Sequence, residues 1–329
     1  MRRTGSVFSS VAAIATKVAA TVFASILILS AAAMAQANRE AQELYNRGRD
    51  RYGKGQVHDA IDDYTRAIAL ISLPTGDQTH AKRKLKLSFG QQAERSPAIA
   101  LLDPLAAAIY ADRSLARYTL GDFEGAMADS NQAIAIDPGL GTAYADRGQI
   151  RSVMGDPAGA IADLSKAIAI DPTDYQSYNN RGGVFYKKGD VDGALVDFDR
   201  AIALNPRVAE IYANRAMART DKEDFDGAIA DTDRAIKLNP RLALAFYVRG
   251  TARFVRKEIE GSISDFSRAV ELDPGFVDAY ANRGLVWLML GQDSKAREDF
   301  ARCLRLDPSA EAELQRHIQA AKQHRIEIR

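Results

Sequence analysis

The sequence has little of the chemistry that builds catalytic or metal sites. It contains one cysteine, Cys303, so no disulfide can form within the chain and a thiolate zinc site lacks its ligands. Of its four histidines, the closest pair, His317 and His324, is seven residues apart, whereas helical metal pairs usually lie three or four apart. No GxxxxGK[ST], GxGxxG, GxSxG or HExxH motif is present. We therefore predict a protein that is not an enzyme, with no catalytic residue, cofactor or metal.

An excess of charge of either sign is also missing. The chain has 44 basic and 43 acidic residues, a formal net charge of +1, and this gives no general attraction to nucleic acids or acidic membranes. At 47% hydrophobic and 26% charged residues, its composition is that of a folded globular protein rather than a disordered chain. We therefore predict no nucleic-acid partner.

One long uncharged run is present, VAATVFASILILSAAAMA, from Val18 to Ala35. It follows a short basic segment and ends in a small-x-small pattern, which predicts a signal peptide over residues 1–35, cleaved before Gln36. The run is long enough that an uncleaved membrane anchor stays the alternative. Export without disulfides predicts the bacterial periplasm, or an inner-membrane anchor facing it, with membrane contact only if the segment is not cleaved.

Short sequence motifs such as YADRG and YNNRG recur along the chain at a fixed period. The small residues that close these motifs are Gly48, Ser114, Gly148, Gly182, Ala216, Gly250 and Gly284. After a first interval of 66 residues every step is 34, and two further columns of small residues and a column of prolines keep the same period. Self-similarity at a fixed period predicts a repeat architecture.

Each repeat is predicted to hold two helices. In the third repeat the first helix is expected from Tyr144 to Met154 and the second from Ala158 to Ile170, which ends before Pro172 because proline cannot continue a helix. The small residues let the two helices approach closely. Since one pair cannot bury its own apolar face, neighbouring pairs must stack into a solenoid.

These columns resemble the tetratricopeptide repeat, with an aromatic residue at the head of each first helix and a proline at the end of each repeat. The resemblance covers residues 41–308, with repeat 1 at 41–74, an insertion at 75–106 and repeats 2–7 at 107–308, followed by a capping helix at 309–329. It implies an exported bacterial member of the family with an all-α fold. That fold is a right-handed superhelical solenoid of helix-turn-helix repeats with a C-terminal capping helix, and the first helices line a concave groove that binds protein or peptide. The insertion is either a solvated loop or a functional segment, namely a docking arm or a lid over the groove.

Two complete columns of opposite charge accompany the small residues. The arginine column is Arg47, Arg113, Arg147, Arg181, Arg215, Arg249 and Arg283, and the aspartate column, sixteen residues later, is Asp63, Asp129, Asp163, Asp197, Asp231, Asp265 and Asp299. A guanidinium and a carboxylate can meet through two parallel hydrogen bonds. We predict structural pairs between the two helices of a repeat, with an anion-binding arginine ladder as the alternative. Arg181→Ala is expected to cost about 2–4 kcal/mol of stability if the pair is buried.

A second, less regular arginine column follows four residues after the first. Its members are Arg51, Arg117, Arg151, Arg219 and Arg253. Three roles stay open for them: contact with aspartates of adjacent repeats, solvation, or ligand binding.

Helical periodicity puts one further set of residues on a shared face of the first helices. These inner-face residues include Tyr45, Arg49, Tyr52, Leu115, Tyr118, Gln149, Asn179, Tyr186, Met217, Tyr247 and Phe254, together with the smaller or less polar Ala111, Ala145, Ala213 and Leu288. An aromatic lining favours an extended or helical peptide with apolar anchors, for which we predict Tyr118, Tyr186 and Phe254. The alternatives are that the rings pack between repeats, and that the protein is a structural or self-associating scaffold of a cell-envelope complex. An enzyme is a distant third possibility, and the sequence leaves the oligomeric state open.

Overall fold

The computed structural model describes residues 35–71 and 102–324, and every regular element in these two ranges is a helix. The chain divides into two compact units, Met1–Asp156 and Pro157–Arg329. The predicted signal segment and most of the predicted insertion lie outside the described residues. No helix in the described ranges has the length and apolar character needed to cross a membrane.

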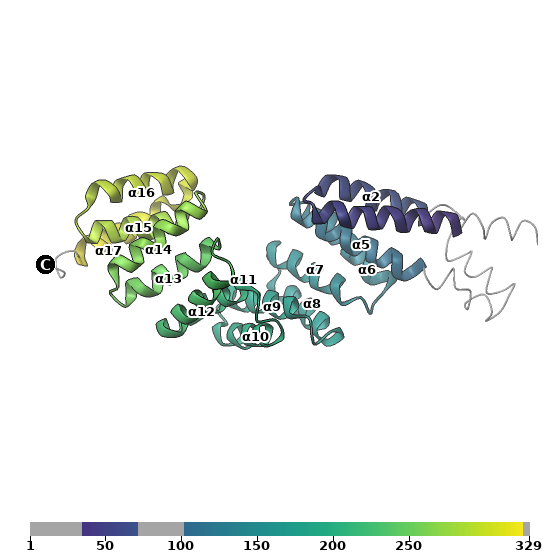
Figure 1. Cartoon of the computed structure of the whole chain (residues 1–329), viewed down its shortest axis with the longest axis horizontal. Coiled ribbons are helices and arrows are strands. Elements are labelled where there is room, and N and C mark those ends of the chain that lie inside the picture. Colours follow the sequence, from purple (N-terminus) through teal and green to yellow (C-terminus); the bar gives the residue numbers. More distant parts are fainter. Residues whose placement is uncertain (1–34, 72–101, 325–329) are drawn as a thin grey trace, which may run out of the picture. The chain divides into compact units, whose positions relative to one another are not determined.

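Unit 1 consists of consecutive helices that pack on their neighbours along the chain (Figure 1). They are a helix over residues 35–53, α2 (Val57–Ile71), α5 (Leu102–Thr119), α6 (Phe123–Ile136) and α7 (Gly141–Val153). Helix α5 contacts α2, α6 and α7. Residues 102–106, which the sequence placed in the insertion, therefore belong to the first helix of repeat 2.

Unit 2 continues the same alternation of first and second helices (Figure 1). Its helices are α8 (Pro157–Ile170), α9 (Tyr175–Lys187), α10 (Val191–Leu204), α11 (Ala209–Asp221), α12 (Phe225–Leu238), α13 (Ala243–Val255), α14 (Ile259–Leu272), α15 (Val277–Met289), α16 (Asp293–Leu306), the 3₁₀ turn η2 (Pro308–Ala310) and α17 (Glu311–His324). Each second helix from α8 to α14 packs on the first helix that follows it, so the pairs stack as a solenoid. The predicted fold class, with its C-terminal capping helix, is confirmed.

The predicted helix boundaries were wrong by a few residues. Helix α7 begins at Gly141 rather than Tyr144, and α8 begins at Pro157 rather than Ala158. Proline suits the first helical position, where its missing N–H has no helical partner anyway. The sequence prediction placed Pro157 in the turn because it treated the residue only as a helix breaker.

Aspartates start several of the second helices. Asp122, Asp190 and Asp224 precede α6, α10 and α12, and each carboxylate accepts a hydrogen bond from the backbone N–H three residues later. Such a side chain satisfies one of the free N–H groups at a helix start and is worth about 1 kcal/mol. The polar turns between first and second helices thus define where each second helix begins.

The core of each repeat depends on a match in volume between two facing positions. A Cβ added to Gly182 would lie 2.8 Å from the ring of Phe198, and the same holds for Gly250 facing Phe266. In repeat 2 the small residue is Ser114, which faces Ser130 and hydrogen bonds to it at 2.7 Å. Glycine therefore stands where the facing residue is a large ring, and a larger residue stands where the facing side chain is small.

We expect Gly182→Ala to destabilise the protein by about 1–3 kcal/mol, because the new methyl group collides with Phe198 and with the Ala194 carbonyl at 3.3 Å. Gly183→Ala is the matched control in the same helix, since its Cβ meets nothing within 4 Å and alanine favours a helix by about 1 kcal/mol over glycine. Urea unfolding of both variants measures the two effects. Equal changes in the two variants would contradict this account of the core.

Helix α17 covers the end of the last repeat. Leu314 and Ala321 are buried against Leu288, Phe300 and Cys303. The polar residues expected to face solvent do so, and they are Glu311, Glu313, Gln315, His317, Lys322 and Gln323. Cys303 is buried in the column that elsewhere holds alanine, and burial raises the pKa of its thiol. The thiol is therefore part of the packing.

Candidate functional site

The arginine and aspartate columns meet as bidentate ion pairs within single repeats. Arg181 donates from Nε and Nη2 to the two carboxylate oxygens of Asp197, both at 2.8 Å. The same two-bond pair joins Arg47 to Asp63, Arg113 to Asp129, Arg215 to Asp231, Arg249 to Asp265, and Arg283 to Asp299. All six carboxylates are buried. Arg147 and Asp163 lie in different units, so their pairing stays a prediction.

The third guanidinium nitrogen of most of these arginines reaches back to the preceding repeat. Arg215 Nη1 donates to Asp199 at 2.6 Å, and Arg181 Nη1 donates to the Ser165 hydroxyl at 2.9 Å. Equivalent bonds run from Arg113 to Thr65, Arg147 to Asn131, Arg249 to Asp233, and Arg283 to Ser267. Each of these six arginines therefore binds the second helix of the previous repeat. For five of the six, the bidentate pair with the aspartate on the second helix of their own repeat is also seen. This is the geometry of a structural clasp rather than of an open anion site.

The second arginine column binds the same aspartates. Arg253 Nη1 lies 2.6 Å from Asp265, an oxygen of which also accepts from Arg249. Arg51, Arg117 and Arg219 approach Asp63, Asp129 and Asp231 at 2.7, 2.9 and 2.9 Å. The expected contact with aspartates of adjacent repeats was wrong for these four, because one helical turn places the second guanidinium beside the carboxylate of its own repeat. Arg151 pairs with Asp156 at 3.8 Å.

The inner-face residues of repeat 1 bond to the next first helix, α5. The Tyr45 phenol hydrogen bonds to Asp112, and Arg49 forms an ion pair with the same carboxylate at 3.5 Å. The Tyr52 hydroxyl lies 3.0 Å from the hydroxyl of Thr119. These side chains join neighbouring repeats, and only Arg49 among the three predicted residues is largely exposed.

The inner face of unit 2 follows the same rule. Asn214 donates to Asn179 at 3.0 Å, and Asn282 donates to the Tyr247 hydroxyl at 3.1 Å. Tyr186 hydrogen bonds to Asp221, and burial together with this bond raises the pKa of its phenol. Thus the residue three positions before the small residue of one repeat meets the residue two positions before the small residue of the next repeat. Likewise, the residue four positions after the small residue meets the residue five positions after the small residue of the next repeat. The sequence analysis missed these partners, because helical spacing shows which residues share a face but not which residue of the next repeat each one reaches.

For the remaining predicted lining residues, no such polar partner on the next first helix is seen within residues 35–71 and 102–324. Leu115, Gln149, Met217 and Phe254 are half-buried, as is Tyr118, whose ring centroid lies 5.6 Å from that of Phe123. Four other positions on this periodic face are buried and line no groove: Ala111, Ala145, Ala213 and Leu288. The three alanines were wrongly placed on the lining because neighbouring first helices pack closely enough to cover small side chains, and Leu288 was wrongly placed there because the capping helix α17 covers it.

Exposed apolar side chains gather at one end of the first helices. In the described residues, the exposed large hydrophobic residues are Leu120, Val153, Met154, Val196, Val255 and Leu290. All but Val196 lie five or six residues after the small residue of their repeat, directly beyond the position of Tyr118 and Phe254. Because they recur in one structural position of several repeats, these apolar groups are candidates for contact with a partner.

Alkaline titration tests the bonds of the inner face. Burial raises the pKa of Tyr247 to about 12, with the charge of Asp278 as a smaller cause, and burial with Asp112 raises that of Tyr45 to about 12. An unfolded phenol titrates near about 10, so the stability from these protonated phenols is present below pH 10 and is lost as the pH rises towards 12. We expect tyrosinate absorbance to rise mainly above pH 10 and together with unfolding. Tyr247→Phe should reduce the absorbance change in this pH range. Full ionisation near pH 10 without unfolding would refute this.

The described residues hold no group of three His, Cys, Asp or Glu side chains placed to bind a metal ion.

Five family models match the chain, all of them described as tetratricopeptide or TPR repeats. The matched residues are 107–140, 141–189, 175–208, 213–275 and 277–310. Comparison with curated proteins finds no match.

Three of the solved structures with a similar fold are compared with this chain by sequence identity, the share of each chain covered and the TM-score. A tetratricopeptide repeat protein from Parabacteroides merdae is 15% identical over 86% of this chain and 99% of its own, with a TM-score of 0.58. PilF of Pseudomonas aeruginosa is 18% identical over 66% of this chain and 98% of its own, with a TM-score of 0.57. The Cut9–Hcn1 structure is 17% identical over 80% of this chain and 52% of its own, at 0.61. At these identities the likeness shows the fold alone.

Proposed function

Since the chain belongs to the tetratricopeptide repeat family, a fold that generally serves protein interaction without catalysis, we propose that it binds a partner polypeptide through the face of its first helices. The observation that carries the proposal is the concentration of exposed apolar side chains beside the predicted anchors. In this scheme the column arginines of repeats 2–7 hold the repeats together and do not contact the partner.

The anchors we propose are Tyr118 and Phe254, with Tyr186 as a third. Tyr118 and Phe254 are half-buried, and their neighbours Leu120 and Val255 are 42% and 49% exposed. The Tyr186 hydroxyl is already bonded to Asp221, which leaves its ring as the binding group. Aromatic anchors commonly carry much of an interface's energy, and truncation of one often costs about 2 kcal/mol or more.

The place of action that we propose is the bacterial periplasm. It rests on the N-terminal sequence, with a cleaved signal peptide or an anchor facing that compartment. The partner is a protein or peptide, and the neutral composition of the chain argues against nucleic acid.

Photo-crosslinking from positions 118, 186 and 254 in intact cells tests the proposal. We expect these positions to capture a defined partner. Val196 is the matched control, because it is an apolar residue that is 68% exposed but lies on the second helix α10. Asp62, exposed on α2, serves as a polar control in unit 1. The same captured proteins at the same yield from controls and anchors would refute the proposed face.

A further inference from the structure

The head position of each first helix, three residues before the column arginine, holds an aromatic ring in repeats 2–7. The column guanidinium lies over this ring at 5.4–5.8 Å from the centroid in all six. In two repeats a second arginine, three residues after the column aspartate, covers the ring as well. Tyr178 lies 5.8 Å from Arg181 and 5.9 Å from Arg200, and Tyr280 is covered likewise by Arg283 and Arg302. The ring thus fills a slot between two cations.

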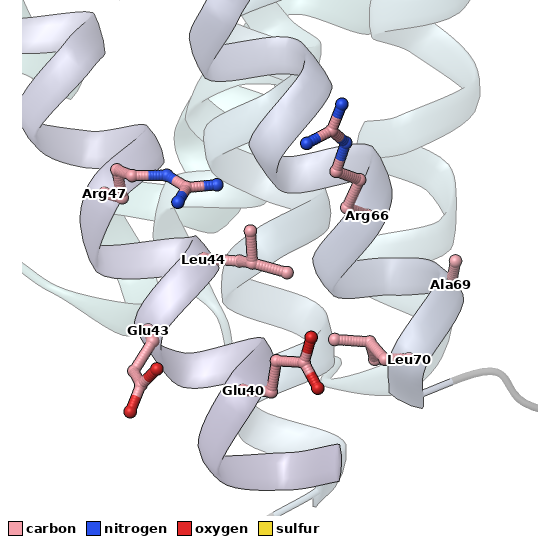
Figure 2. A pocket seen from close by; sticks show the side chains of 7 residues that line it. All are labelled: Glu40, Glu43, Leu44, Arg47, Arg66, Ala69 and Leu70. Atoms are coloured by element: carbon pink, nitrogen blue, oxygen red, sulfur yellow. The ribbon is translucent and has the colours of Figure 1, made fainter.

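Repeat 1 keeps both cations and lacks the ring. Arg47 and Arg66 occupy the two arginine positions, but the head position is Leu44. A pocket of ≈ 680 Å³ opens there, lined by Glu40, Glu43, Leu44, Arg47, Arg66, Ala69 and Leu70. Figure 2 shows the two guanidinium groups at one end, on either side of Leu44, and the carboxylates of the two glutamates at the other.

In the described residues, repeat 1 also lacks the oxygen acceptor that the preceding repeat supplies to the other column arginines. Within the described residues, Arg47 Nη1 has no partner of the kind that Ser165 gives Arg181 or Asp199 gives Arg215. The Arg47 side chain is accordingly 49% exposed, against 10% for Arg113. Two groups that the other repeats supply internally, a ring and an acceptor oxygen, are therefore absent at this pocket in the described chain.

The pocket is suited to a single side chain and not to another stacked repeat. The position of Glu43 is occupied in repeats 2–7 by residues that are small or apolar and buried: Ile109, Ala143, Ser177, Ile211, Ala245 and Ala279. A glutamate there disfavours a closely packed apolar helix, because the charge would lose its solvation.

We propose that this pocket binds an aromatic side chain of a partner polypeptide, inserted between Arg47 and Arg66, with a neighbouring carboxylate of that polypeptide accepting from Arg47 Nη1. The site is separate from the first-helix face and does not depend on it. Its size lies within the range of about 300–1,000 Å³ common for ligand pockets.

The test uses the full chain and two probe peptides, acetyl-Gly-Asp-Tyr-Gly-amide and the same peptide with leucine in place of tyrosine. NMR titration of the arginine Nε–Hε signals measures both dissociation constants. We expect the tyrosine peptide to bind at least tenfold more tightly and to shift the signals of Arg47 and Arg66. Leu44→Tyr, which fills the slot from within, and Arg66→Gln should each weaken binding tenfold or more. Arg234→Gln, the same position in repeat 5 where Tyr212 is present, should leave it unchanged.

Three results would overturn the proposal. Equal binding of the two peptides, or unchanged binding by both Leu44→Tyr and Arg66→Gln, would remove the slot as the site. Signals of Arg47 and Arg66 that shift with protein concentration alone would assign the pocket to a second copy of this chain. Ring-current shifts of these signals in the free monomer would assign it to an aromatic residue of this chain outside the described ranges. The crosslinking test of the first-helix face, from positions 118, 186 and 254, does not depend on any of these three results.

Discussion

Replacing Asp265 with asparagine is expected to lower the free energy of unfolding by about 3–5 kcal/mol, the range for breaking a buried ion pair by removing one partner. Asp265 is buried and accepts from Arg249 at 2.7 and 3.0 Å and from Arg253 at 2.6 Å. Asparagine keeps the shape but removes the buried charge that both guanidinium groups share, so Arg249 is left with Asp233 and Arg253 with Glu258, two partly exposed carboxylates. Urea unfolding followed by circular dichroism measures the loss.

Asp197 supplies the matched comparison for this effect. It is equally buried, but among the described residues Arg181 alone pairs with it, because the second arginine position of that repeat holds Phe185. Asp197→Asn should therefore cost less than Asp265→Asn, and Asp62→Asn, at an exposed position on α2, should stay within about 0.5 kcal/mol. Equal losses at positions 197 and 265 would mean that the second arginine column adds nothing to stability.

Replacing Leu314 with aspartate is expected to detach the capping helix α17. Leu314 is 4% exposed and packs with Leu288 and Phe300. Loss of a buried leucine side chain alone costs about 2–5 kcal/mol, and a buried unpaired carboxylate adds to that cost. Hydrogen exchange should show loss of protection in α17, and light scattering should show self-association through the uncovered apolar end of the last repeat.

Gln315→Asp is the control for the capping helix, since position 315 is exposed and adjacent in the same helix. It should change neither hydrogen exchange nor light scattering. Retained protection of α17 in Leu314→Asp would show that the helix does not depend on this contact.

The fold was readable from sequence because one repeat length governs packing throughout. Columns of small residues and prolines at steps of 34 predict paired helices, and the sixteen-residue offset of arginine and aspartate points to the contact seen between Arg181 and Asp197. The helix starts were less readable, because Gly141 and Pro157 are residues that end helices as often as they begin them.

The site was predicted less completely than the fold. Helical spacing shows which residues share a face, but it does not show that Tyr247 reaches Asn282, thirty-five residues on, or that Ala213 is covered. The shared carboxylates were missed because the second arginines were expected to contact aspartates of adjacent repeats, to stay solvated or to bind a ligand, whereas one carboxylate can accept from two guanidinium groups of its own repeat. The pocket beside Leu44 depends on a ring that is absent, which is visible only once the rings of the other repeats are placed.

The central claim is that the recurring arginine of repeats 2–7 is architecture and that the proposed partner contact of these repeats belongs to the first-helix face. A double-mutant cycle on Arg181 and Asp197, with unfolding free energy and crosslinking from position 254 as paired readouts, tests it most directly. The expected result is a coupling energy of about 1–3 kcal/mol in stability with unchanged partner capture by the folded double variant. No coupling in stability, together with loss of partner capture, would show that Arg181 binds a ligand and would contradict the account.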